Sequence, residues 1–136
     1  MDRLLRVEVV TAERRVLQER AESVILPAAN GYLGVLPGHA PLIAGLSVGV
    51  LQFGGYHAEK RRVAVSGGFA EVADDRVTVL ADTAELAEEI DVERARRAAE
   101  RAERRLRERQ AHVDHHRAEM ALRRAINRIK AAGGRM

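Results

Sequence analysis

The chain contains no cysteine and no tryptophan, and only 3% of its 136 residues are aromatic. Without cysteine it forms no disulfide and holds no metal through thiolates, a composition typical of a reducing cytoplasm. No apolar run approaches the roughly 18 residues of a membrane-spanning helix, and the N-terminus lacks a basic segment followed by an apolar one. The sequence therefore predicts a soluble, cytoplasmic protein that does not insert directly into a membrane.

Proline, glycine and aromatic residues are scarce in the second half of the chain. All three prolines, all four aromatic residues and nine of the eleven glycines lie in residues 1–81. Charge changes at the same place: residues 82–93 hold six acidic residues and no basic one, whereas residues 94–136 hold fourteen Lys and Arg against five acids. A localised basic surface favours an anionic partner: a nucleotide, nucleic acid, acidic protein face or membrane surface.

Short segments of alternating polarity dominate the first half. Leu5, Val7 and Val9 alternate with Arg6 and Glu8, the pattern of a half-buried strand. Further short apolar runs lie at 24–26, 48–53, 63–65 and 77–80. Turn-forming residues separate them, at 29–31, 54–55, 66–68 and 74–75. This pattern predicts an all-β antiparallel sandwich or flattened barrel over residues 1–84.

The segment 31–42, Gly-Tyr-Leu-Gly-Val-Leu-Pro-Gly-His-Ala-Pro-Leu, is the most unusual of this half. Its glycines and prolines favour a rigid corner between two strands. The alternative is a docking loop with His39 at its tip. We expect no metal site at His39, because no second His, Asp or Glu lies at ligand spacing nearby. We also expect no catalytic site, because no triad or P-loop is visible and Ser66-Gly67-Gly68 is interpreted as a turn.

Two helical patterns fill residues 85–136. Asp91 and Asp114 are placed as N-caps, and Gly133-Gly134 follows the second pattern. Alanine-rich stripes recur every three or four residues, at Ala95, Ala99, Ala102 and Leu106, then at Ala118, Leu122, Ala125, Ile129 and Ala132. The first stripe loses register around 110–113. We therefore predict an antiparallel two-helix hairpin over residues 85–136.

The alanine stripes indicate that the hairpin docks weakly. A buried alanine methyl contributes much less than a leucine side chain, for which about 1.5–3 kcal/mol is typical. We expect pairs spaced four residues apart to stabilise the helices instead: Glu93–Arg97, Glu100–Arg104, Glu103–Arg107 and Glu119–Arg123. Helices that are stable by themselves but dock weakly are typical of a movable arm. A permanently docked helical hairpin is the alternative, and the periodicity of the sequence does not exclude it.

Four arginines have the spacing of a phosphate site. Arg94 and Arg101 are seven residues apart on one helix, and Arg124 and Arg128 are four apart on the other, so each pair shares a helical face. If the two faces meet in the hairpin, the guanidinium groups repel one another unless an anion lies among them. A solvated basic face is the commoner arrangement, and spacing alone leaves both open.

The order of three motifs ahead of an Ala/Arg-rich hairpin resembles the epsilon subunit of the bacterial F-type ATP synthase, over nearly the whole chain. The motifs are 31–42, 66–72 and 77–84. The resemblance implies a non-catalytic rotor subunit without a prosthetic group, which binds the gamma subunit and the c-subunit ring and couples proton transport to ATP synthesis. It also implies a peripheral position on the cytoplasmic face of the cell membrane. Tyr32 and His39 would contact the rotor, although Tyr32 stands where many relatives have an acid.

The same resemblance implies a regulatory arm. Its compact form would lie against the sandwich, and its extended form would inhibit ATP hydrolysis by contacting acidic segments of the alpha and beta subunits. The basic residues for that contact are Arg117, Arg123, Arg124, Arg128 and Lys130.

A subset of the family binds ATP on the compact arm through a motif that Ile90-Asp91-Val92-Glu93-Arg94-Ala95 matches. Carried over by position, Ile90 and Asp91 would contact adenine with Glu85 nearby. The phosphates would lie among Arg94, Arg101, Arg124 and Arg128. ATP is then a regulatory ligand.

Two other functions are weaker. A nucleic-acid or acidic-protein binding module would use the basic helices, but the aromatic residues that stack on bases all lie in the other half of the chain. An independent ATPase would need a P-loop and a magnesium-binding arrangement, and neither is visible.

Overall fold

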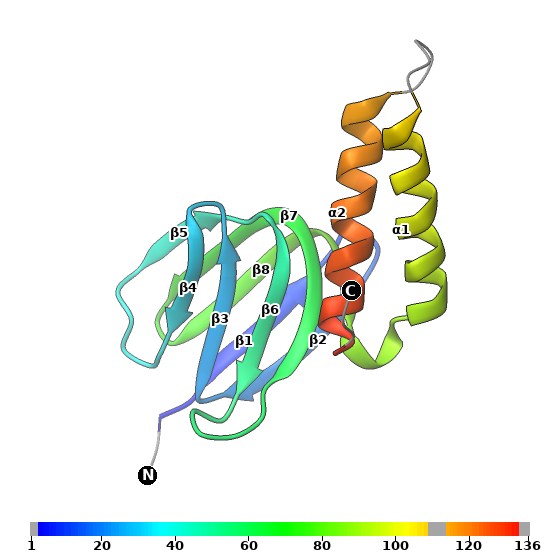
Figure 1. The fold of residues 1–136 in the computed structure, drawn as a ribbon. Helices are drawn as coiled ribbons and strands as arrows, with labels where there is room; N and C mark the ends of the chain where they lie inside the picture. The colour runs from blue at the N-terminus through cyan, green and yellow to red at the C-terminus, as the bar shows by residue number, and fades with distance from the viewer. Residues whose placement is uncertain (1–2, 109–113, 134–136) are drawn as a thin grey trace.

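A computed structural model of the chain describes residues 3–108 and 114–133. Within these residues a β-sandwich precedes a helical hairpin, as predicted (Figure 1). The strands are β1 (Leu5–Val10), β2 (Arg15–Ala21), β3 (Ser23–Ala28), β4 (Gly31–Val35), β5 (Leu42–Gly45), β6 (Val48–Gly54), β7 (Arg61–Ala73) and β8 (Arg76–Leu86). The short 3-10 helix η1 (Ala87–Glu89) leads to α1 (Val92–Arg107) and α2 (His115–Ala131).

The strands follow the order β2-β1-β8-β7-β6-β3-β4, and β5 pairs with β7. The pairs are antiparallel except for β1 with β8, which is parallel. Inward-facing side chains form one core, and Leu5, Val7 and Val9 are each 0% exposed. The alternation seen in the sequence therefore arises from one buried and one exposed face. Strand β8 continues to Leu86, two residues beyond the boundary expected at 84.

The predicted turn at Ser66-Gly67-Gly68 is wrong, because these residues lie inside β7. Residues 61–66 of β7 pair with β6, and residues 69–72 pair with β5. Gly67 and Gly68 have φ values of +76° and +105°, and a Cβ on Gly68 would overlap the carbonyl of Leu80. The glycines therefore bend β7 so that one strand serves both layers of the sandwich. The turns expected at 29–31, 54–55 and 74–75 are confirmed.

Both predicted helix caps are confirmed. The Asp91 carboxylate accepts the Arg94 backbone N–H at 3.1 Å, and the Asp114 carboxylate accepts that of Arg117 at 2.9 Å. Helix α2 ends at Ala131, and Gly133 follows with a φ of +87°. The turn expected around 110–113 and Gly134 lie outside the described residues.

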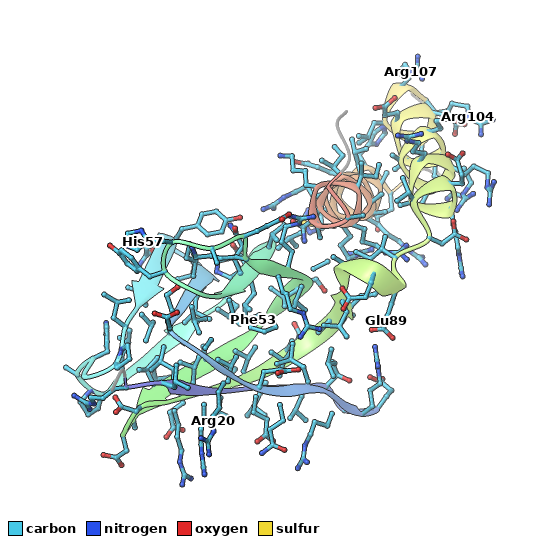
Figure 2. The ribbon with its side chains drawn as sticks, turned by 90° about the horizontal axis from the view of Figure 1, so that it is seen from below. Arg20, Phe53, His57, Glu89, Arg104 and Arg107 are labelled. Carbon is cyan, nitrogen blue, oxygen red and sulfur yellow. The ribbon has the colours of Figure 1, made fainter. Side chains whose placement is uncertain are left out.

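Helix α2 lies between the sandwich and α1 (Figures 1 and 2). The alanine stripes are buried at Ala95, Ala99, Ala102, Ala118 and Ala125. Leu106 and Leu122 are only partly buried. Because α1 packs on α2 and α2 packs on β6 and β7, the alanines of α1 hold the hairpin together and leave its docking to α2.

The four expected ion pairs along the helices do not form within the described residues, which corrects that prediction. Glu93 pairs with Arg96 at 3.2 Å, and Arg107 donates to the backbone oxygen of Glu103 at 3.4 Å. These side chains are exposed, and an exposed pair contributes only about 0.2–1 kcal/mol, too little to fix one geometry against solvation.

Candidate functional site

The contact between α2 and the sandwich centres on Asn127, which is 8% exposed. Its amide nitrogen donates to the carbonyl oxygens of Gly49 in β6, at 2.7 Å, and Val65 in β7, at 3.4 Å. A buried amide that satisfies two buried carbonyls is costly to remove. Sequence reasoning missed Asn127 because it lies off the alanine stripe, on the side of α2 that faces the sheet.

Two arginines add polar contacts between the arm and the sandwich. Arg128 donates from Nε and Nη2 to the two carboxylate oxygens of Glu85, at 2.7 and 3.2 Å. Arg62 of β7 donates from Nε to the carbonyl oxygen of Ala131 at 2.7 Å. Ala131 is the last residue of α2, and a cation at the C-terminus of a helix stabilises it. The expected alanine-lined docking surface is therefore corrected: the arm meets the sheet through directed hydrogen bonds.

The acidic segment between the two halves is tied to the sandwich. Arg61 pairs with Glu88 at 3.1 Å, and Arg14 pairs with Glu89 at 3.2 Å. The pKa of Glu88 lies below its usual range, because its own backbone N–H and the Arg61 guanidinium stabilise the carboxylate. Ile90, immediately after η1, is buried beside Val50, Ala64 and Ala131. These contacts set where the hairpin leaves the sandwich.

A cavity of about 480 Å³ lies between the hairpin and the sheet. Of the residues expected to bind ATP, Glu85, Arg124 and Arg128 line it. Arg14 also lines it, a residue that sequence reasoning missed because it precedes β2 and only the fold brings it here. The Ser66 and Thr83 hydroxyls, which hydrogen-bond to each other, form part of the sheet side. The volume of this cavity falls within the roughly 300–1,000 Å³ of small-molecule sites.

The other expected ATP-binding residues lie elsewhere. Arg101 lines a second cavity of about 610 Å³ between the two helices, which shares Ala98 and Ala121 with the first. Asp91 and Arg94 are exposed at the start of α1, and neither lines these cavities in the described structure. The docked arm thus brings together three of the seven expected residues.

The basic residues expected to contact acidic partners lie along α2. Arg117, Arg123, Arg124 and Lys130 are exposed, whereas Arg128 is partly buried by its pairing with Glu85. Most of this basic face is therefore accessible while the arm is docked.

Asp75, in the turn between β7 and β8, holds the corner at 36–41. The Asp75 carboxylate accepts the Gly38 backbone N–H at 2.7 Å and pairs with Arg3. His39 lies in this corner, where its backbone N–H donates to Leu36 O at 3.2 Å. Tyr32 lies apart from it, in β4: its hydroxyl accepts the Val50 N–H at 3.4 Å. The two residues expected to contact the rotor together are thus on different parts of the sandwich.

Lowering the pH should weaken the contacts by which the Asp75 carboxylate holds the 36–41 corner. The Gly38 N–H and Arg3 lower the pKa of this carboxyl below its ordinary 3.8. Its contribution is therefore complete above about pH 4 and is lost as the pH falls through the lowered pKa. We expect the amide chemical shift of Gly38 in NMR to follow this titration. In Asp75→Asn the shift should stay flat over the same range, and a titration that persists in the variant would exclude Asp75 as its source.

An apolar patch covers the outer face of β5, β7 and β8. Ile43, Phe69 and Leu80 are 73%, 62% and 57% exposed. Phe69 lies directly opposite Leu80, which lies opposite Val10 of β1. Neighbouring exposed apolar side chains of this size are typical of a protein–protein contact.

Two family models together match the chain from residue 4 to residue 133. Residues 4–87 match the β-sandwich domain of the ATP synthase delta/epsilon chain, and residues 88–133 match its long alpha-helix domain. The ATP synthase epsilon chain of Moorella thermoacetica is 60% identical over 129 residues, covering 95% of this chain and 96% of that relative. That of Desulforamulus reducens is 53% identical over 134 residues, covering 97% and 99%.

A solved structure shares the fold of this chain. A chain in the mitochondrial ATP synthase of Euglena gracilis, an OSCP/F1/c-ring structure, is 28% identical, with a TM-score of 0.75 over 88% of this chain and 76% of that one. None of the described helices is long and apolar enough to cross a membrane. The chain therefore belongs to the ATP synthase delta/epsilon family, as a non-catalytic epsilon subunit of the rotor stalk.

Proposed function

We propose that this epsilon chain couples proton transport to ATP synthesis by attaching its sandwich to the gamma subunit through the apolar patch. The exposure of Ile43, Phe69 and Leu80 on one face is the observation that carries this proposal. The corner at 36–41 contacts the c-subunit ring, and its fixed geometry supports that role. The chain is then peripheral, on the cytoplasmic face of the cell membrane.

We further propose that the arm regulates hydrolysis. In the docked form ATP binds in the cavity beneath α2, with its phosphates beside Arg124 and Arg128. In the extended form the basic face of α2 contacts the alpha and beta subunits and inhibits ATP hydrolysis. ATP at a hundredfold excess over its Kd would stabilise the docked form by about 2.7 kcal/mol. Low ATP would then release the arm.

The apolar patch is tested by Phe69→Asp, which places a charge where the contact excludes water. We expect affinity for the purified gamma subunit to fall about twentyfold, because a buried unpaired carboxylate adds to the lost apolar contact. Tyr56→Asp is the matched control, since Tyr56 is 56% exposed in a turn beyond this patch. Calorimetry measures both. Equal affinities for wild type and Phe69→Asp would exclude the patch as the contact.

A further inference from the structure

Three arginines lie side by side on the outer face of the sandwich. Arg6 of β1 is in register with Arg20 of β2 on one side and with Arg76 of β8 on the other. All three are exposed, and Val7 and Val77, the neighbours in register, are buried, so the arginines share the outward face. Figure 2 shows Arg20 pointing away from the sandwich, on the side opposite the helices. A groove of about 580 Å³ runs over this row.

No carboxylate of the described residues pairs with these three arginines. The nearby acids are engaged elsewhere: Glu8 with Arg15, and Glu19 with Arg61. Like charges directly opposite one another on neighbouring strands destabilise a sheet. The row therefore costs the isolated sandwich some stability, which an external anion would offset.

The row continues into a banded surface. Two residues along the strands, Glu8 and Thr78 lie in register and form a second band that includes Glu71. Two residues further on come Val10, Leu80 and Phe69 of the apolar patch. Because two residues advance a strand by about 6.6 Å, the arginine row and the apolar band lie about 13 Å apart on one continuous face.

We propose that the row of Arg6, Arg20 and Arg76 binds carboxylates on the same protein partner that covers the apolar patch. The banding favours a protein over a polyanion, since Glu8 and Glu71 would repel a lipid surface or a nucleic acid laid across this face. The apolar band supplies affinity, and the charged row sets the orientation of the partner and speeds its association. This inference rests on the proposed attachment to the gamma subunit.

The test compares Arg6→Gln/Arg76→Gln with wild type in binding to the purified gamma subunit over a range of salt. We expect about tenfold weaker binding at low salt, and a difference that nearly disappears at about 0.5 M salt, where charges are screened within a few Å. Thermal melting should show no loss of stability in the variant, because repulsion between the arginines is relieved. Arg97→Gln/Arg104→Gln, the same change of charge on α1, should bind as wild type.

Binding of Arg6→Gln/Arg76→Gln that matches wild type at every salt concentration would overturn the inference. So would unchanged gamma binding combined with a loss of binding to vesicles of anionic lipid, since the row would then serve a membrane. The Phe69→Asp variant separates this failure from that of the proposed function. If Phe69→Asp weakens binding and the arginine variant does not, the apolar contact stands and the charged row is excluded.

Discussion

Asn127→Ala is expected to release the arm from the sandwich. Its side chain satisfies the carbonyls of Gly49 and Val65, and removing it leaves both without their buried donor. At about 1–3 kcal/mol for a buried unsatisfied group, the docked population should fall about a hundredfold relative to the undocked one. The helices themselves should persist, because the Asp91 and Asp114 caps and the contacts between α1 and α2 remain.

Distances between two spin labels measure this change. The chain has no cysteine, so cysteines introduced at the exposed positions Tyr56 and Arg104 are unique attachment sites. Glu119→Ala, an exposed position on the same helix, is the control and should keep the wild-type distance distribution. An unchanged distribution in Asn127→Ala would mean that the other contacts, chiefly Arg128 with Glu85, dock the arm.

In the assembled ATP synthase the same variant should inhibit ATP hydrolysis more strongly than wild type. A larger undocked population supplies more of the form that we propose contacts the alpha and beta subunits. Hydrolysis at or above the wild-type rate would contradict the proposed inhibitory role of the arm. It would not contradict the conclusion that Asn127 docks the arm on the sandwich.

Arg128→Ala is expected to weaken ATP binding about fiftyfold, since a charged hydrogen bond contributes about 1.5–3 kcal/mol. Arg128 lines the cavity beneath α2, and its guanidinium is held by Glu85 at 2.7 Å, so it is already oriented there. Titration calorimetry of the full chain with ATP measures the change. Arg123→Ala is the control, because Arg123 is adjacent on α2 but does not line this cavity. Equal losses in both variants would indicate a general effect of charge.

Arg94 gives a second comparison for ATP. The resemblance of residues 90–95 to an ATP-binding motif implies that Arg94 lies beside the phosphates. In the docked arm, however, Arg94 is exposed and lines neither cavity within the described residues. A loss of affinity in Arg94→Ala as large as in Arg128→Ala would mean that the start of α1 moves on binding. No loss would place the phosphates beneath α2 alone.

The two expected effects are linked. If ATP binds only the docked arm, it should restore docking in Asn127→Ala, by about 2.7 kcal/mol at a hundredfold excess over Kd. The spin-label distances of Asn127→Ala with and without ATP test this. If the distances do not change when ATP is added, in a variant that still binds ATP, then ATP binds the docked and undocked forms equally well.

Features that depend only on neighbouring residues could be predicted from the sequence. The alternation of Leu5, Val7 and Val9 identified a strand, because side chains of a strand point to opposite faces. Asp91 and Asp114 identified the starts of both helices, because a cap acts on backbone N–H groups within three residues. The division into a sandwich and a hairpin follows from such local patterns.

Features that depend on residues far apart in the chain became visible only in the fold. Gly67 and Gly68 suggest a turn locally, yet they bend a strand because β7 must pair with both β5 and β6. Asn127 is buried because carbonyls of β6 and β7 face it, and Arg14 reaches the cavity only through the path of the chain into β2. The row of Arg20, Arg6 and Arg76 exists only in the register of three strands, which no local pattern specifies.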